Sequence, residues 1–368
     1  MLFDPKPKED RKDLYGRDEE LNRLIEAMNS ATPIILLLGV RRIGKTSLLK
    51  TALKELGQPY VYLDLRILEE EGYSKAILYN MLSKEVSRVV SRWKSLLDFL
   101  RKVKGVRIAG FHIEFDWRDR ELALSSIFRS IDEWARRTEE ARYVIVAFDE
   151  AQLLRNMVGG KGKIDFRSLL AFCYDNLSYI KFVLTGSEVG LLTDFVGLED
   201  PKSPLYGRVM EEIVVERFDN NKSLGFLKKG FEEIGMDVSN EVLMEAVEKL
   251  DGIVGWLTYF GYVSSRKGRV SRDVLREAVD RAKKLVRDEL GKILVRSKLY
   301  RLILRTLALD INRWSQVKKA IEAWLGRQVT NAQVSRALRT LMKMGIIEKR
   351  ENGYYIVDPI VKALAKEL

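Results

Sequence analysis

The sequence predicts an α/β fold, in which a parallel sheet carries helices on both faces and is followed by a helical lid and a winged helix-turn-helix. Three observations carry this prediction. A short apolar strand, residues 34–38, runs into a glycine loop and then a helix. A second apolar strand, residues 143–148, ends in two adjacent carboxylates, Asp149 and Glu150. Near the C-terminus, helical periodicity changes to an alternating hairpin at residues 346–357.

Length and composition bound the class of protein. With 368 residues, 46% of them hydrophobic, the chain can form two or three domains with ordinary cores. One cysteine, Cys173, and one histidine, His112, exclude a disulfide framework, a Cys/His zinc site and a Cys–His catalytic pair. The first residues are too charged for a signal peptide, and no apolar run approaches the ~18–20 residues of a membrane span. We therefore expect a soluble, cytoplasmic protein.

The first elements lead up to the glycine loop. Residues 1–13 are charged and are expected to be loosely ordered. Leu21, Leu24 and Met28 recur at helical spacing and predict a helix. The apolar run 34–38 that follows is typical of a strand buried on both faces of a parallel sheet.

The loop after this strand matches the phosphate-binding pattern G-x-x-x-x-G-K-[ST] at every fixed position. Its glycines allow a tight turn whose N–H groups converge, and the N-terminus of the next helix adds positive potential. Lys45 is expected to reach the β- and γ-phosphates, and the Thr46 hydroxyl to take one ligand position of Mg²⁺. A chance glycine turn is the alternative, and the strand–loop–helix context argues against it. The residues expected to bind nucleotide here are Gly39, Val40, Arg41, Arg42, Ile43, Gly44, Lys45, Thr46 and Ser47.

Between the loop and the carboxylates the sequence predicts more structure than a minimal crossover needs. Residues 60–65 are expected to form a second core strand. Alternation around Gly110 predicts an inserted β-hairpin at residues 106–115. Helices are expected over residues 75–93, 95–102 and 122–137.

The two carboxylates are the second chemical signature. Because neighbouring residues of a strand point to opposite sides, Asp149 and Glu150 are expected to have different roles. Asp149 is suited to hold Mg²⁺, usually through water, and Glu150 to polarise the water that attacks the γ-phosphate. Acids often end strands, so the pair is informative because a complete phosphate loop precedes it.

A further core strand, residues 180–187, ends in hydroxyl side chains. Strand C-termini in such sheets face the ligand crevice. Thr185 or Ser187 is therefore expected to hydrogen-bond the γ-phosphate or the attacking water. Capping of a helix that starts at Glu188 is the alternative.

An arginine lies just before the next strand. Arg208 precedes residues 211–215, which are expected to be extended. An arginine there could neutralise charge on the transferred phosphoryl group, within its own subunit or on a neighbour. A surface ion pair with Glu211 or Glu212 is the structural alternative.

The remainder of the chain is predicted to form two smaller units. Residues 218–292 show only helical patterns and are expected to form a lid beside the sheet. From residue 293, three helices lead into a hairpin that turns at Asn352-Gly353, which is typical of a winged helix. The predicted domains are 14–217, 218–292 and 293–368.

Positive charge is concentrated at the C-terminal end. The chain carries a net charge of +11, and residues 293–368 hold 15 Lys/Arg against 6 Asp/Glu, which leaves +9 there. Such asymmetry suggests an acidic partner, with double-stranded DNA first. Winged helices also bind proteins, and surface charge often only solvates a domain. The residues expected to contact DNA lie on the third helix and the wing: Arg336, Arg339, Lys343, Lys349 and Arg350.

Several motifs occur in a fixed order along the chain: Tyr15-Gly16-Arg17, GVRRIGKTSL, FDEAQ, LTGSEVGLL, PLYGR and the winged helix. In this combination the chain resembles the archaeal ATPases of the STAND class, relatives of the AAA+ initiators among P-loop NTPases. The resemblance implies an ASCE sheet, with one strand between the Asp149 strand and the nucleotide-loop strand. It implies ATP as the nucleotide, Gly16 and Arg17 near the adenine, and Arg208 on the γ-phosphate side. It also implies a lid contact at residues 252–256, where Val254 replaces the family's proline.

Three functions remain open at this level. The first is a Mg²⁺-dependent ATPase switch, a monomer or nucleotide-dependent oligomer, in which hydrolysis changes how the winged helix is presented. The second is a DNA-binding factor in replication, repair or mobile-element control, with ATP setting only its shape. The third is a signalling scaffold whose winged helix docks on a protein. The expected cofactors are ATP and Mg²⁺, and no membrane partner is expected.

Overall fold

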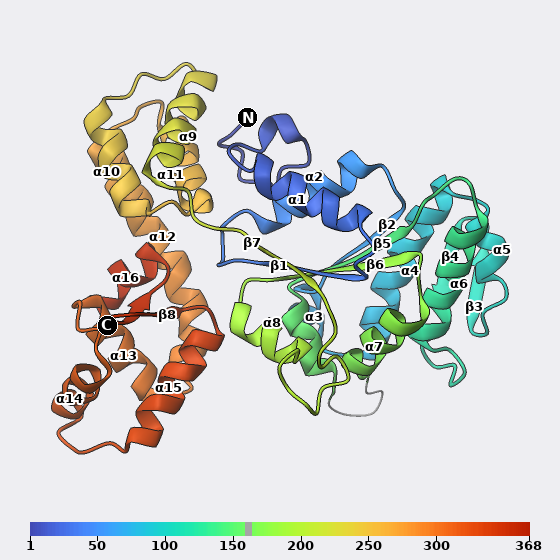
Figure 1. Ribbon diagram of the computed structural model, residues 1–368. Coiled ribbons are helices and arrows are strands. Elements are labelled where there is room, and N and C mark those ends of the chain that lie inside the picture. The colour runs from blue at the N-terminus through green and yellow to red at the C-terminus, as the bar shows by residue number, and fades with distance from the viewer. Residues whose placement is uncertain (159–163) are drawn as a thin grey trace.

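The computed structural model describes residues 1–158 and 164–368 and confirms the predicted architecture: a parallel sheet with helices on both faces, a helical lid and a winged helix (Figure 1). The sheet has the order β2-β5-β6-β1-β7, and every neighbouring pair is parallel. One strand, β6, therefore separates the strand that ends at Asp149 from the strand that enters the glycine loop. The strands are β1 (Ile34–Leu38), β2 (Tyr60–Asp64), β5 (Val144–Asp149), β6 (Ile180–Gly186) and β7 (Glu211–Val214).

Strand β1 shows why these strands are apolar throughout. Its alternating side chains enter two separate hydrophobic clusters, Ile34 and Leu36 on one face and Ile35 and Leu37 on the other. Both faces are covered, so neither set can be polar. Helices α1 (Asp18–Asn29) and α2 (Lys45–Leu56) cover one face. The other face is covered mainly by α4 (Lys75–Arg92), α6 (Leu124–Arg137), α7 (Phe166–Asn176) and α8 (Val189–Val196).

The inserted hairpin is present as predicted. Strands β3 (Val106–Ala109) and β4 (His112–Phe115) pair antiparallel around Gly110. The outer edge of β4 meets α4, where Ser87 and Ser83 accept hydrogen bonds from the N–H groups of Ile113 and Phe115 at 2.8 and 2.9 Å. Short helices α3 (Ile67–Glu71) and α5 (Leu96–Leu100) complete this region.

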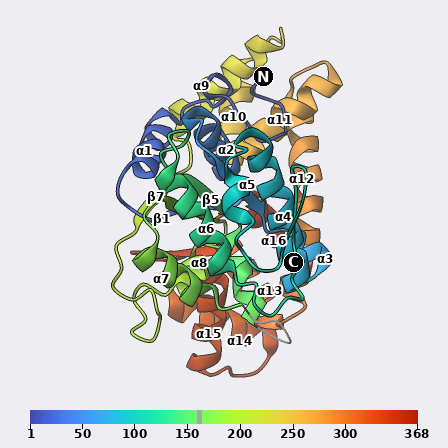
Figure 2. The ribbon, with the colours of Figure 1, turned by 90° about the vertical axis from the view of Figure 1, so that its right-hand side faces the viewer.

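The lid and the winged helix share one continuous hydrophobic cluster. Helix α12 (Arg272–Leu294) runs from one to the other, and Figure 2 shows it along the side of the molecule with the lid at one end. The expected boundary at residue 292 lies within the last turn of this helix. The lid also contains α9 (Asn220–Glu233), α10 (Asn240–Leu250) and α11 (Val254–Lys267). The winged helix contains α13 (Lys298–Ala308), α14 (Trp314–Leu325), α15 (Asn331–Lys343), β8 (Ile347–Arg350), β9 (Gly353–Ile356) and α16 (Pro359–Ala365).

The expectation that residues 1–13 are loosely ordered is wrong. Leu2 and Phe3 are buried against the lid, and Arg11–Asp13 form a 3₁₀ turn. The prediction rested on the many charges of this segment. Its two apolar residues, Leu2 and Phe3, order it nevertheless, because they pack into the hydrophobic cluster of the lid. No helix within the described ranges combines the length and the apolar character that a membrane span needs.

Candidate nucleotide site

The glycine loop connects β1 to α2 as the motif requires. Gly39 and Gly44 have φ angles of 153° and 101°, a region that side chains disfavour, and Gly44 is the N-cap of α2. The Lys45 ammonium donates to the carbonyls of Gly39 at 2.7 Å and Val40 at 3.0 Å. The lysine therefore lies over the concave side of the loop, at the N-terminus of a helix. This is an anion site built from backbone N–H groups and one cation.

Lys45 is only 6% exposed, and two acids lie near it. Burial lowers its pKa to about 8, while the charges of Glu150 and Asp149 oppose this shift. The ammonium form is thus still favoured at neutral pH. A phosphate placed in the loop would favour it further.

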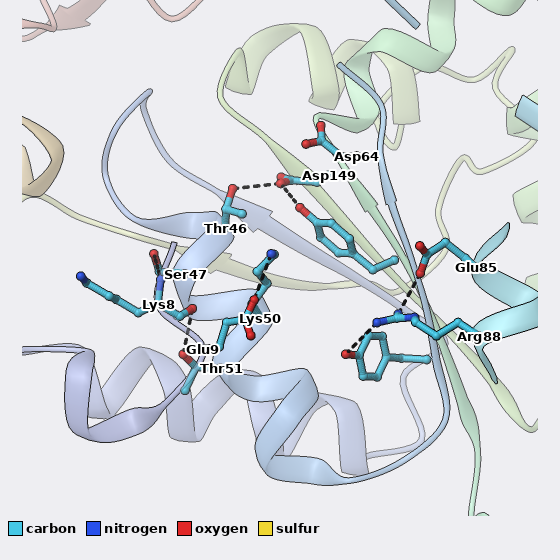
Figure 3. A network of polar contacts seen from close by, with 12 residues as sticks. Lys8, Glu9, Thr46, Ser47, Lys50, Thr51, Asp64, Glu85, Arg88 and Asp149 are labelled. Atoms are coloured by element: carbon cyan, nitrogen blue, oxygen red, sulfur yellow. Dashed lines mark hydrogen bonds and ion pairs between the residues drawn. The ribbon is translucent and has the colours of Figure 1, made fainter. Parts of the chain in front are cut away.

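Asp149 lies opposite the start of α2 and accepts three hydroxyl hydrogen bonds. One carboxylate oxygen accepts from Thr46 at 2.9 Å and from Tyr62 at 2.7 Å (Figure 3). The other accepts from Thr185. Burial and the neighbouring Asp149 charge raise the pKa of Tyr62, which keeps its hydroxyl a donor. The oxygen donors of Thr46 and Asp149 fit Mg²⁺, which prefers hard ligands and one or two carboxylates beside substrate phosphates.

Glu150 is held in a sparsely populated backbone conformation, with φ of 58°. One of its carboxylate oxygens accepts hydrogen bonds from the Gln152 amide at 2.6 Å, the Ser187 hydroxyl at 2.7 Å and the Ser187 N–H at 3.1 Å. Its own N–H donates to Thr185 at 3.2 Å. Burial favours the neutral acid, but Lys45 and these donors outweigh it, and the pKa of Glu150 is lowered. The Glu150 side chain is therefore an ionised carboxylate, and the hydrogen bonds from Gln152 and Ser187 fix its orientation.

Gly16 and Arg17 lie beside the loop, where the sheet domain meets the lid. The Arg17 guanidinium is buried, lies 4.4 Å from the centre of the Phe218 ring and donates to the Ile43 carbonyl at 3.3 Å. Its Nε has no hydrogen-bond partner within the described part of the chain. A Cβ on Gly16 would meet the same phenylalanine ring at 3.6 Å. The expected adenine residues are thus next to the phosphate loop and leave a buried donor for a ligand.

The outer part of the loop contacts the lid. Arg42 pairs with Glu289 of α12, and its guanidinium lies 4.3 Å from the ring centre of Trp256. The N–H of Gly255 donates to the Arg42 carbonyl at 2.8 Å, and a Cβ on that glycine would lie 2.7 Å from the Arg42 Cβ. Arg41 also reaches Glu289, at 3.3 Å. The lid segment 252–256 therefore touches the nucleotide loop without a proline at Val254.

The alternative interpretation of the strand-end hydroxyls, that they cap the next helix, is wrong. Neither Thr185 nor Ser187 caps α8, because Glu188 is its N-cap and makes no side-chain cap bond. Both hydroxyls are engaged by Asp149 and Glu150 instead. They are thus part of the carboxylate cluster, and a direct contact with γ-phosphate stays a prediction.

Arg208 does not join the site of its own chain, and that part of the expectation is wrong. It pairs with Asp175 at 2.7 Å and with the Pro204 carbonyl, and it lies ahead of β7, whose first residue pairs with Ile35 near the start of β1. The phosphate loop follows the other end of β1, so the sheet separates the two. Glu211 binds Arg23 instead. A role of Arg208 on a neighbouring chain stays a prediction.

The five expected DNA residues are in different situations. Arg336, Arg339 and Lys349 are exposed. Arg350 pairs with Glu348. Lys343 is turned to the sheet domain, where it pairs with Asp194 of α8. Lys343 is thus an interdomain contact in this structure rather than an open DNA contact.

Sequence reasoning missed four residues of the site: Tyr62, Gln152, Trp256 and Glu289. Gln152 follows Glu150 by two positions, and that proximity was a usable signal. The others belong to β2, α11 and α12, and only the packing of these elements brings them to the loop.

Comparison with known proteins identifies the family to which a chain with this site is similar. Residues 14–260 match the model of an ATPase domain predominantly from Archaea, and residues 294–357 match the C-terminal winged helix-turn-helix domain of MCM proteins. A solved Walker-type ATPase of Pyrococcus abyssi is 38% identical, with a TM-score of 0.84 and 100% of each chain covered. The ORC2 protein of Aeropyrum pernix is 14% identical, with a TM-score of 0.63, 100% of this chain and 96% of that chain covered, and shares the fold. Comparison with curated proteins found no match.

Proposed function

This chain belongs to the family of ATPase domains found predominantly in Archaea, and we propose that it is a Mg²⁺-dependent switch of the STAND class that couples its nucleotide state to duplex DNA binding by the winged helix. The observation that carries the proposal is a chain of contacts from the phosphate loop through the lid to the winged helix. Arg42 of the loop stacks on Trp256, and the indole N–H donates to Asp358 at 3.0 Å. Asp358 in turn caps α16, accepting from the Ile360 N–H at 2.8 Å.

A second contact supports coupling from the catalytic side. The turn after α15 rests on the sheet domain, where a Cβ on Gly345 would lie 3.0 Å from the Ser187 carbonyl. A Cβ on Gly190 of α8 would lie 2.7 Å from the Lys343 Cα. Ser187 also holds Glu150 through its hydroxyl and N–H. The winged helix thus abuts the residue that orients the catalytic acid.

We assign the roles at the site as follows. Lys45 and the loop N–H groups bind the phosphates, and Glu150 accepts the proton of the attacking water, held in place by Gln152 and Ser187. Thr46 and Asp149 would hold Mg²⁺, which would neutralise charge on the phosphate oxygens. Thr185 orients Asp149. Gly16 and Arg17 face the adenine.

We expect duplex DNA to change the rate of ATP turnover by full-length protein, because the turn after α15 and the catalytic acid both contact Ser187. The measurement is steady-state ATP hydrolysis with and without duplex at low salt. The matched control is the Arg336→Ala, Arg339→Ala double variant, which removes two exposed charges from α15. It should lose the response and reduce the salt slope of DNA binding by about two.

The outcomes separate the open functions. If duplex DNA does not change the rate of ATP turnover, and no salt-dependent DNA binding is found, the proposed coupling to DNA is contradicted. That result would favour a winged helix that docks on protein. Salt-dependent binding without any turnover would favour a DNA-binding factor whose nucleotide sets only its shape. Point variants are preferable to removal of residues 293–368, because the lid and the winged helix share a core.

Asp194→Lys is expected to raise duplex affinity about fivefold. The change replaces the ion pair with Lys343 by repulsion, which should release α15 from α8. Both side chains are more than a third exposed, so the effect should be about 1 kcal/mol. Titration of labelled duplex by fluorescence anisotropy measures it. Glu199→Lys, the same charge change at an exposed position nearby, is the control. Equal gains for the two variants would attribute the effect to general charge.

A further inference from the structure

The N-terminal segment connects two parts of the molecule that bracket the nucleotide site. We call residues 2–11 the strap. One end is buried in the lid, and the other runs along α2, the helix that begins in the phosphate loop. None of the nucleotide roles assigned above involves this segment.

The lid end of the strap is a buried aromatic anchor. The Phe3 ring lies 4.8 Å from that of Phe231 and 5.8 Å from that of Phe226, edge-on to both. A Cβ added at Gly230 of α9 or Gly261 of α11 would overlap this ring. The two glycines therefore form a socket that any side chain would close. The Leu2 N–H also donates to Glu233 of α9 at 2.7 Å.

The other end of the strap follows one face of α2, as Figure 3 shows for Lys8 and Glu9 against Ser47, Lys50 and Thr51. The Lys8 N–H donates to the Ser47 hydroxyl at 3.0 Å, so the strap binds the first turn of α2, one residue after Thr46. Further along α2 the partners recur at helical spacing. The ion pairs are Glu9–Lys50 at 3.2 Å, Asp10–Lys54 at 2.7 Å and Arg11–Glu55 at 2.9 Å.

The link between the two ends is short and stiff. Only residues 4–7 lie between the Phe3 anchor and Lys8, and two of them, Pro5 and Pro7, have restricted backbones. From Phe3 to Lys8 the chain makes five residue steps, which span at most about 18 Å. The Lys8 ammonium further ties the link by donating to the Asp4 carbonyl at 2.9 Å. The lid therefore cannot move far from α2 while both ends stay bound.

We propose that the strap is a tether that holds the lid against the phosphate-loop helix and thereby sets the rate of nucleotide release. The inference rests on the proposed function in one respect, that nucleotide lies between the sheet and the lid. A buried aromatic ring is costly to remove, whereas exposed ion pairs contribute little. Opening of the lid therefore peels the strap off α2 first. That motion withdraws the Lys8 N–H from Ser47, and so loosens the phosphate site as the lid opens.

The test lengthens the tether and keeps both of its ends. A flexible linker of about eight Gly/Ser residues is inserted between Lys6 and Pro7 in the full chain. We expect release of fluorescent N-methylanthraniloyl-ADP, measured by stopped-flow chase with unlabelled ADP, to become about tenfold faster. The matched control carries the same linker after Gly110, at the tip of the β3–β4 hairpin, where no atom would meet an added Cβ within 4 Å. It should release at the parental rate.

A second variant addresses the anchor. Phe3→Ala should speed release in the same direction, and Phe3→Leu, which keeps an apolar group in the socket, should act less. Release from the linker variant at the parental rate would overturn the tether, and so would equal acceleration by the control insertion. Failure of the parental protein to bind the labelled ADP would overturn the proposed function and the tether together. Normal binding with unaltered release overturns only the tether.

Discussion

Glu150→Gln is expected to bind ATP as the parental protein does and to hydrolyse it about 10²–10⁴-fold more slowly. The glutamine amide oxygen can still accept the hydrogen bonds from Gln152 and Ser187, so the side chain should stay in place. What it loses is the negative charge that accepts a proton from water. The variant should therefore impair hydrolysis without impairing nucleotide binding. The measurements are nucleotide affinity by titration calorimetry and steady-state turnover.

The control for this variant is Asp64→Asn, which removes a carboxylate from the end of the neighbouring strand. Asp64 pairs in register with Asp149, but its side chain is bound by Arg66 at 2.8 Å. Its turnover should stay within about threefold of the parental value, as expected for a charge outside the reacting atoms. Parental turnover by Glu150→Gln would show that another group activates the water.

Lys45→Ala is expected to lose measurable nucleotide binding, with affinity reduced at least about a hundredfold. The ammonium is buried within the loop, and a charged hydrogen bond in such a site is worth about 3 kcal/mol. Without it, Asp149 and Glu150 would face the phosphates with one cation fewer. Titration with labelled ADP measures the loss. The control, Lys84→Ala, removes the same charge from an exposed position on α4 and should bind normally.

The affinity of Lys45→Ala for ADP decides whether this lysine binds the phosphates. If the variant binds ADP at the parental affinity, phosphate binding does not depend on this lysine, and the site must lie elsewhere. A lower unfolding temperature of the variant would not by itself explain a loss of ADP binding, because binding is measured well below that temperature. The native state of each variant is checked by far-ultraviolet circular dichroism at the titration temperature.

Short-range patterns predicted most of the fold. The strand into the glycine loop, the hairpin at Gly110 and the helices of the lid each depend on neighbours within about twenty residues of sequence. The same holds for the roles suggested for Lys45 and Thr46, whereas the roles of Asp149 and Glu150 also required the phosphate loop earlier in the chain. Once two parallel strands end at one edge of a sheet, residues at those ends come close together. Thr46 and Asp149 do so at 2.9 Å.

The residues that the sequence did not reveal depend on contacts between distant segments. Phe3 needs Gly230 and Gly261 to form its socket, and nothing local marks those glycines as a pair. Trp256 and Asp358 are 102 residues apart and meet only because α16 packs near the lid. Arg208 looked catalytic from its place before a strand. The direction of β7 in the sheet puts it at the edge away from the loop.

The sequence by itself determined that this chain has a phosphate loop, a pair of strand-end carboxylates and a winged helix, because a tight turn, a strand end and a helical period are local properties of the backbone. Tertiary structure alone decided how these parts are connected. It places Trp256 between the loop and the winged helix, Ser187 between Glu150 and the turn after α15, and the strap between the lid and α2. The physical reason is that the partner of a buried ring or a paired charge is chosen by the packing of whole elements, which no short stretch of sequence contains.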